Sequence, residues 1–389
     1  MRPRRAHKKS RIGCIECKRR HIKCDESRPT CVNCSTVERR CSYFNKAPTS
    51  SVSTRLSHGT NHSTASPEAS VIMGKNFEWF AVQQSDDELP VNMNHLELLL
   101  QFLTETFKFS GIDQNGAETT FQVTIKYGLS SPCLMHEILA LAALHLSIVR
   151  PEKQQFYRHQ AALLQTRALS LFNHAKADIT ADNCVPMFLF SSYLGVHVLC
   201  DTLTFRDNNF NVFLERFVSY LHLHRGVRAI TNRSWHLLRE TELKPVLEAA
   251  ESLPQTKEGI GRECDGLQLL IRSADLSPSV VHACQQAIVH LQWVFDGQGT
   301  LPEGNPSVIF AWPVLVSAEY ADLLMQRTPE ALIILAYYAV LLYYRREIWV
   351  FGDAGRFLIE SITRRLGPYW EKWLAWPNSV LVAASQPAP

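Results

Sequence analysis

The sequence lacks long apolar runs, strand-like alternation and repeats of fixed period, and each absence narrows the choice of fold. Its longest apolar stretches, near residues 187–200 and 331–344, fall short of the ~20 residues that cross a bilayer. We therefore expect no transmembrane segment, and we interpret both stretches as buried helices. Because apolar and polar residues do not alternate over sustained stretches, the sequence favours helices over β-strands.

A secretory signal is also missing, because the basic residues 2–11 are not followed by an apolar segment. Without such a signal we expect an intracellular protein, in which disulfides are rare and clustered cysteines bind metal. Six of the eleven cysteines lie between Cys14 and Cys41. The sequence therefore predicts a metal site near its beginning.

The formal net charge is only +3, but the charge is unevenly distributed. Residues 1–46 carry fourteen Lys or Arg and four acidic residues, a balance of +10. The rest of the chain must then carry about −7, which follows from the same composition. A small basic segment joined to a mildly acidic body indicates a polyanion-binding module attached to a part with another task.

The chain is expected to be mainly α, with a small cysteine-rich domain, a flexible linker, a large all-helical regulatory domain and a disordered tail. The linker is rich in Ser, Thr, Ala, Pro and His, and it lacks the apolar groups that would offset the entropy of ordering it. The expected segments are residues 1–46, 47–91, 92–376 and 377–389.

Proline pairs predict where helices of the large domain begin. In each pair a hydroxyl residue can cap the helix, and proline at the first helical position loses no hydrogen bond. The helix that follows Thr328 is apolar on nearly every side, so we expect it at the centre of a domain of about ten helices. The three pairs are Ser131-Pro132, Ser277-Pro278 and Thr328-Pro329. One face of the helix after Ser131 should carry Leu134, Ile138, Leu141, His145 and Ile148, with Pro151 ending the run.

The clustered cysteines are separated by two, six, six, two and six residues, so one two-then-six unit occurs twice. Two thiolates two residues apart reach one zinc ion from a tight turn, and a third returns six residues later. Two tetrahedral ions need eight ligand positions, so six sulfurs suffice if one cysteine of each half bridges both ions. The sequence predicts two zinc ions per chain, with Cys14 and Cys31 as bridges. The six ligands are Cys14, Cys17, Cys24, Cys31, Cys34 and Cys41.

The string CIECKRRHIKCDESRPTCVNCSTVERRC resembles the fungal binuclear zinc-cluster, or Zn(II)2Cys6, regulators in all six ligands and every gap. The resemblance implies a nuclear, sequence-specific RNA polymerase II transcription regulator that binds double-stranded DNA. A disulfide knot would need an oxidising compartment, and a metal store would need neither the basic content nor the long body.

Five basic or titratable residues lie between the second and third cysteines, in a segment expected to contain the first short helix: Lys18, Arg19, Arg20, His21 and Lys23. Such side chains can reach guanine in the major groove. The resemblance assigns base reading of a CG-containing triplet to Arg20 and His21, although His21 replaces the more usual Lys or Arg. Lys18, Arg19 and Lys23 are expected on phosphates. The basic residues of this domain also offset the −2 charge of six thiolates and two Zn²⁺, but there are more of them than charge neutralisation requires.

Residues 2–11, RPRRAHKKSR, are interpreted as a nuclear import signal or as an arm that binds phosphate, with a merely solvated end as the plain alternative. We include Arg11, the last residue of this run, among the DNA-binding candidates.

The body resembles the regulatory domain of the sterol uptake control type of zinc-cluster regulators. That resemblance implies an apolar pocket for a sterol or another apolar ligand, whose occupancy controls movement from cytoplasm to nucleus. The alternative is a pathway-specific regulator of a secondary-metabolite gene cluster with no sterol ligand. The similar stretches are MNHLELLLQFLTETF, LMHEILALAALHLSIVRPE, YRHQAALLQTRALSLFN, HLHRGVRAI and YWEKWLAWP.

No catalytic constellation is visible in the body, so we expect no enzyme; an enzyme would instead place convergent titratable groups in its largest cavity. His136-Glu137 begins like a zinc-protease motif, but Ala140 stands where the second histidine is required. His222 and His224 would point different ways on a helix. We interpret His145 as a core histidine and most of the other five cysteines as buried free thiols.

Residues 47–90 contain no apolar heptad pattern, so we expect no coiled coil there. If the protein forms a homodimer, the helical body should make it.

Overall fold

The computed structural model describes residues 13–27, 30–37, 41–42, 91–110, 114–175, 178–206, 209–251, 261–298 and 306–383. The chain divides into two compact units, residues 1–84 and 85–389, and each is described by itself. The first unit contains two short helices, α1 (Ile15–Arg19) and α2 (Val32–Ser35). The predicted linker lies outside the described residues up to position 90.

The second unit is mainly helical, and its described residues include no strand, as expected for a mainly α protein. The described residues of this unit contain fourteen α-helices, more than the ten expected from the sequence, because several are too short to show a full helical period. They are α3 (Met93–Thr104), α4 (Gln114–Ser130), α5 (Pro132–Val149), α6 (Gln154–Ala175), α7 (Cys184–Thr204), α8 (Phe210–Leu238), α9 (Lys244–Glu251), α10 (Asp265–Ser273), α11 (Pro278–Gln298), α12 (Ala311–Leu315), α13 (Ala318–Met325), α14 (Pro329–Tyr344), α15 (Ala354–Leu366) and α16 (Glu371–Ala383).

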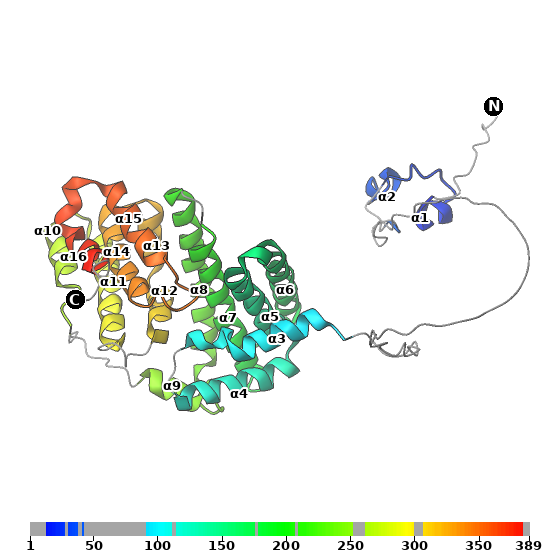
Figure 1. The fold of residues 1–389 in the computed structure, drawn as a ribbon, viewed down its shortest axis with the longest axis horizontal. Coiled ribbons are helices and arrows are strands. Elements are labelled where there is room, and N and C mark those ends of the chain that lie inside the picture. Colours follow the sequence, from blue (N-terminus) through cyan, green and yellow to red (C-terminus); the bar gives the residue numbers. More distant parts are fainter. Residues whose placement is uncertain are drawn as a thin grey trace, which may run out of the picture. The chain divides into compact units, whose positions relative to one another are not determined.

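The helices of this body form two groups joined by the long helix α8. Figure 1 shows α3 to α7 on one side of α8, and α10 to α16 on the other. Helix α5 packs along α6 and against α3 and α7, whereas α8 packs on α7 as well as on α12 and α13. Residues 330–343 of α14 are all buried, which confirms the prediction that this helix lies in the core.

The proline pairs predicted three helix starts correctly, since α5, α11 and α14 begin at Pro132, Pro278 and Pro329. The predicted caps differ at two of them, because the hydroxyls of Ser131 and Thr328 make no capping hydrogen bond. The Ser131 hydroxyl instead lies 3.3 Å from Cys133 Sγ. The fixed φ of proline is therefore the stronger start signal here.

The prediction of a disordered tail from residue 377 is wrong for residues 377–383, which belong to α16. Pro377 lies inside this helix and is buried, and Leu381 is buried further along. Asn378 Nδ2 donates to Thr363 Oγ1 of α15 at 3.0 Å and to Leu374 O at 2.9 Å. Packing on α15 thus holds a helix that the proline alone would be expected to stop. Residues 384–389 lie outside the described residues.

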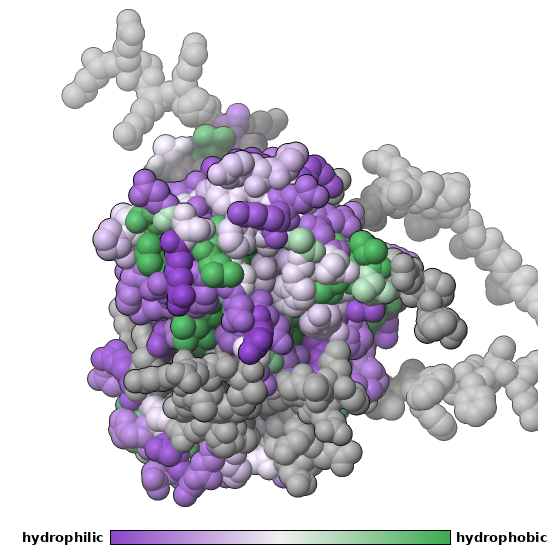
Figure 2. Space-filling model, turned by 90° about the vertical axis from the view of Figure 1, so that its left-hand side faces the viewer, coloured by the Kyte–Doolittle hydropathy of each residue, from purple (hydrophilic) through white to green (hydrophobic). Residues whose placement is uncertain are grey.

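Two helices, α5 and α7, are long and apolar enough to span a membrane by length and composition, and a bent pair of shorter helices within residues 308–325 would make a third. Helix α7 extends beyond the apolar stretch noted near residues 187–200, because the flanking residues are helical too, whereas α5 was not among the stretches noted. In the body, 67% and 61% of their most apolar windows are buried against other helices. Figure 2 shows a mainly hydrophilic face of the molecule with separate small apolar patches. The apolar character of both helices is therefore explained by the core of the body.

Candidate metal centre and nucleic-acid interface

The six cysteines of the first unit lie together and form two groups of four thiols. Within each group the sulfur atoms all lie within 4.8 Å of one another. Cys14 and Cys31 belong to both groups, so six sulfurs offer the eight ligand positions that two tetrahedral ions need. The groups are Cys14, Cys17, Cys24 and Cys31, and Cys14, Cys31, Cys34 and Cys41.

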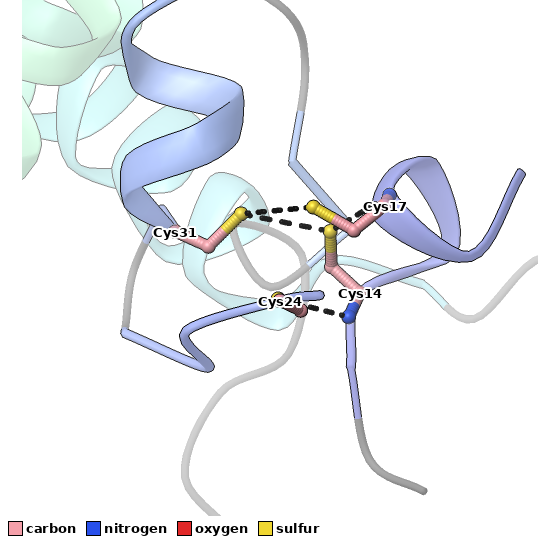
Figure 3. A group of neighbouring side chains, drawn as sticks. All are labelled: Cys14, Cys17, Cys24 and Cys31. Atoms are coloured by element: carbon pink, nitrogen blue, oxygen red, sulfur yellow. Dashed lines mark hydrogen bonds between the residues drawn. The ribbon is translucent and has the colours of Figure 1, made fainter. Parts of the chain in front are cut away.

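The distances between sulfurs fit zinc. Cys31 Sγ lies 3.7 Å from Cys14 Sγ and 3.6 Å from Cys17 Sγ, and Figure 3 shows these three sulfurs pointing toward one another. Cys14 Sγ is also 3.7 Å from Cys34 Sγ. A tetrahedron with Zn–S bonds of ~2.3 Å separates its sulfurs by about 3.8 Å. The six cysteines are thus positioned to bind two zinc ions, which would supply structural crosslinks.

Helix α1 begins directly after Cys14, because the Cys14 side chain takes the part of an N-cap. Its sulfur accepts a hydrogen bond of 3.3 Å from the N–H of Cys17, and its backbone is extended. The first helix was expected between the second and third cysteines. It instead begins at Ile15, directly after the first cysteine, and ends at Arg19, because the sulfur of Cys14 caps its first turn.

Backbone N–H groups donate to sulfur in the same way in both halves. The N–H of Cys14 donates to Cys24 Sγ at 3.4 Å, and that of Cys31 donates to Cys41 Sγ at 3.5 Å. Such bonds favour thiolates and orient them for metal binding. The first cysteine of each half thereby holds the third.

The two halves also cap each other's helices. The N–H of Ile15, at the start of α1, donates to Ser42 Oγ at 2.9 Å. The N–H of Val32, at the start of α2, donates to Asp25 Oδ2 at 3.2 Å. Ser42 and Asp25 each follow the third cysteine of the opposite half, so the pseudo-two-fold relation extends beyond the sulfurs.

The thiols need a cation to coexist as thiolates. Burial raises the pKa of the Cys17 thiol to about 12 and raises that of Cys31 as well. Burial also disfavours the thiolate of Cys24, but the N–H groups of Cys14 and Glu26 lower its pKa to about 7. Zinc displaces the thiol protons when it binds, so folding of the site is coupled to metal binding.

Sulfur replaces an apolar core in this unit. The six cysteines are its only buried hydrophobic cluster within the described residues. Ile15 and Val32, by contrast, are 71% and 59% exposed. A unit this small without an apolar core depends on its metal for stability.

Residues 12–50 match the model of the fungal Zn(2)-Cys(6) binuclear cluster domain. Residues 12–50 therefore form the zinc-cluster domain of a fungal transcription regulator. As a regulator of this type it binds DNA and is not an enzyme, and such factors are generally nuclear. The prediction of two zinc ions per chain is confirmed by the match and the geometry together.

Two relatives are similar to this regulator over most of its length. A Zn(2)-C6 fungal-type transcription factor of Gibberella zeae is 25% identical over 98% of this chain and 87% of its own. The Zn(2)-C6 fungal-type transcription factor afumD of Aspergillus fumigatus is 26% identical over 85% of this chain and 84% of its own. Sterol uptake control protein 2 of Candida albicans is 30% identical over only 24% of this chain and 13% of its own. No solved structure matches.

The basic side chains of the zinc-cluster domain follow the first helix. Lys18 and Arg19 lie in the last turn of α1, and Arg20 is its C-cap. Lys18, Arg19, His21 and Lys23 are exposed, whereas Arg20 is half-buried. They form one continuous basic ribbon, defined here as residues 18–23, at the carboxyl end of α1. Arg11 lies outside the described residues.

His21 ends the helix in a left-handed conformation, with φ of 53°. Its N–H donates to Lys18 O at 3.2 Å, and the N–H of Ile22 donates to Cys17 O at 3.1 Å. This is the Schellman pattern, which usually places glycine where His21 stands. A side chain at this position therefore costs folding free energy. A functional role of the exposed His21 side chain would explain why glycine is not used here.

Arg20 also braces the two halves of the domain, which the sequence did not predict. Its Nη1 donates to the backbone oxygen of Asn33 at 3.5 Å, and Asn33 Nδ2 donates to Lys23 O at 2.8 Å. Arg19 pairs with Glu16 at 3.0 Å on the surface. Any test of base reading by Arg20 must therefore control for the integrity of the cluster.

In the helical body, His145 is a core histidine, as its apolar stripe predicted. Its Nδ1 lies 3.2 Å from Gln101 Nε2 and 3.0 Å from Thr106 Oγ1, and its ring stacks on Trp349 with centroids 4.3 Å apart. Burial lowers the pKa of His145 to about 4, so it is neutral at pH 7. These contacts give it a structural role.

The remaining body candidates behave as expected. His222 is exposed and His224 is buried, so the two side chains lie on different faces of α8, as predicted. None of the five body cysteines forms a disulfide: Cys133 is partly buried, and Cys184, Cys200, Cys264 and Cys284 are buried.

The body holds one buried polar pair that the sequence did not predict. Glu137 of α5 lies with its Oε1 3.2 Å from His197 Nδ1 of α7, and both side chains are buried. The sequence contained a signal for this pair, because Glu137 lies among the core positions Leu134, Ile138 and Leu141 of α5. A charged residue on a buried stripe is rare and requires a partner.

Proposed function

We propose that this regulator recognises CG-containing DNA half-sites through the basic ribbon. Arg20 and His21 read base edges, while Lys18, Arg19, Lys23 and Arg11 bind phosphates. The observation that supports this assignment is the exposed cationic segment that directly follows the helix capped by the cluster. Phosphate contacts supply affinity and base contacts supply specificity.

The test compares Arg20→Ala with Lys18→Ala in the zinc-loaded full chain. Arg20→Ala should cost ~1–3 kcal/mol and relax discrimination at one base pair, whereas Lys18→Ala should weaken all sequences alike. Binding is measured on the sequence selected from a random DNA pool and on scrambled DNA. Equal losses by both variants on both DNAs would refute the assignment.

Zinc content must be measured for each variant, because Arg20 also donates to Asn33 O. Arg20→Lys is the matched control: it keeps the charge but loses the planar fork that contacts guanine twice. It should retain affinity for scrambled DNA and still lose discrimination.

We further propose that the helical body forms a homodimer through α3. Four apolar residues follow one another on this helix at spacings of three and four and remain exposed, while Leu98 and Phe102 on the other side are buried. This spacing is that of a coiled-coil seam. The exposed residues are Met93, Leu96, Leu100 and Leu103, at 69%, 48%, 61% and 37%.

The body is also proposed to regulate the DNA-binding domain in response to a small molecule, with ligand-controlled nuclear entry as one route. A sterol is the ligand that the sterol uptake control type implies, but that likeness covers 24% of this chain. Likeness over most of the chain is to the two fungal-type factors. We therefore favour a pathway-specific regulator without a sterol ligand. Titration of the full chain with ergosterol tests this choice, and saturable binding would reinstate the sterol.

A further inference from the structure

Side chains of helices α5, α6 and α7 line a partly open cavity of about 480 Å³ in the body. Leu144 of α5 and Ala161 of α6 contribute apolar surface, but most of the lining side chains are polar. Arg158 and Gln165 come from α6, and His197 and Asp201 come from α7. Titratable groups therefore converge in this cavity, as they do in enzymes, although the relatives of this chain are transcription factors.

His197, one partner of the buried Glu137–His197 pair, lies in the wall of this cavity. His197 lines the cavity although its side chain is only 5% exposed, and Glu137 behind it is 0% exposed. Within the described part of the chain, neither carboxylate oxygen of Glu137 has a hydrogen bond of acceptable geometry, and neither has His197 Nδ1. Gln165 Nε2 is a further buried donor without an acceptor there.

Incomplete hydrogen bonding of buried polar groups costs folding free energy. A buried carboxylate is costly unless it is paired and hydrogen-bonded, and an apolar replacement of the same size is often more stable. Two such residues line one cavity and a third, Glu137, lies against one of them, which is unusual because buried polar groups in native proteins nearly always have partners. A polar occupant of the cavity would provide those partners.

Arg158 gives this cavity a cationic group that is only loosely paired with Asp201. Its guanidinium stacks on Phe205, 4.0 Å from the ring centroid, which fixes its orientation. Its Nη2 lies 3.8 Å from Asp201 Oδ1, beyond hydrogen-bond distance. Asp201 is held instead by Arg216, whose Nη2 donates to Asp201 Oδ2 at 2.8 Å. The donors of Arg158 and Gln165 thus exceed the acceptors that face them.

We propose that this cavity binds a small metabolite that carries an oxyanion, a carboxylate or a phosphate. The guanidinium of Arg158 pairs with the oxyanion in a fork, and Gln165 Nε2 donates to it. His197, oriented by Glu137, hydrogen-bonds a polar group at the buried end. A sterol would leave these groups without partners, so the polar side chains of the cavity favour an oxyanion over a sterol as the occupant. The proposal rests on ligand sensing by the body and gives the ligand its class.

The test uses the zinc-loaded full chain at constant ionic strength. Citrate, succinate and inorganic phosphate are titrated separately, with sodium chloride as the control, and thermal unfolding of the body is followed by circular dichroism. We expect at least one of the three anions to raise the Tm saturably. The anion that does so distinguishes a carboxylate from a phosphate ligand. If all three act no differently from chloride, the proposal is overturned.

Paired variants locate the site. Arg158→Gln should weaken binding of that anion at least tenfold, whereas Arg167→Gln, exposed on the same helix, should leave it unchanged. Equal effects of the two changes would overturn the proposal, because they would mark a non-specific charge effect.

Glu137→Gln removes the buried carboxylate and keeps the shape, so it should raise the Tm of the free protein and weaken anion binding. A lower Tm with unchanged binding would show a purely structural pair.

DNA affinity is measured in parallel on the selected sequence. Arg158→Gln and Glu137→Gln should leave it unchanged, because the zinc-cluster domain is intact. Loss of anion binding with retained DNA binding supports a separate ligand site. Failure of the basic-ribbon variants would instead bear on DNA recognition alone, so the two proposals can fail independently.

Discussion

The zinc-cluster domain and the helical body are stabilised in opposite ways. The first buries six sulfurs and leaves Ile15 and Val32 on its surface, whereas the second buries residues 330–343 of α14 without interruption. Metal coordination therefore supplies the folding free energy of one unit, and removal of apolar area from water supplies that of the other. The comparison shows why a short sequence match identified the chain while its body required the structure.

Zinc removal should separate the two units most clearly. Chelation should unfold residues 14–41 completely and leave the body folded, because only the first unit lacks an apolar core. Metal analysis should give two zinc ions per chain before chelation, and amide exchange should then show protection lost only in this segment. One zinc ion per folded chain, or loss of body helicity on chelation, would contradict the comparison.

Two glycine substitutions probe packing in the body. A Cβ added at Gly355 of α15 would lie 2.5 Å from Tyr343 N and 2.6 Å from Ala339 O, both backbone atoms of α14. Gly355→Ala should thus destabilise the body by ~1–3 kcal/mol, as overpacking does. At Gly226 of α8 nothing lies within 4 Å, so Gly226→Ala should stabilise it by ~0.5–1 kcal/mol.

Thermal unfolding of the body measures both changes, with DNA affinity as the readout for the other unit. The two substitutions should have opposite signs and leave DNA affinity unaltered. The same sign for both would mean that the close approach of α14 and α15 does not limit the fold.

Association should belong to the body and not to the DNA-binding half. Fragment 1–90 is expected to sediment as a monomer at micromolar concentration and to bind a single half-site weakly. The full chain should dimerise, and Leu100→Glu should abolish the dimer because Leu100 is exposed in the α3 seam. Leu163→Glu, at a similarly exposed position on α6, is the matched control.

The salt dependence of DNA binding checks the same prediction. A single domain that neutralises ~4–6 phosphates should show about half the salt slope of a symmetric dimer. A dimeric fragment 1–90 would place an association element before α3.

The smallest expected effect concerns the end of α1. His21→Gly should stabilise the zinc-cluster domain by ~0.5–1 kcal/mol, because glycine adopts positive φ without strain. The chelator concentration that removes half the zinc should rise about two- to fivefold. Arg20→Gly, at φ of −83°, should lower it. Equal effects would show that the conformation of His21 stores no strain.

A structural feature could be predicted from the sequence when the residues that determine it are close together along the chain. The helix starts at Pro132, Pro278 and Pro329 were predictable because proline acts on its own residue. The extension of α16 past Pro377 was not, because Asn378 is held by Thr363 of another helix. Likewise α1 was misplaced because a sulfur, and not a hydroxyl, caps it.

The spacing of the cysteines was enough to identify the zinc cluster and therefore the class of the protein. Tetrahedral coordination constrains ligand type and spacing within a few residues, so two units of two-then-six gaps permit little else. The chemistry of the body, in contrast, depends on how its helices pack. Glu137, Arg158 and His197 lie on three helices, and no local pattern specifies which faces of those helices meet. Packing of the whole core selects those faces, because burial is a collective property of the helices.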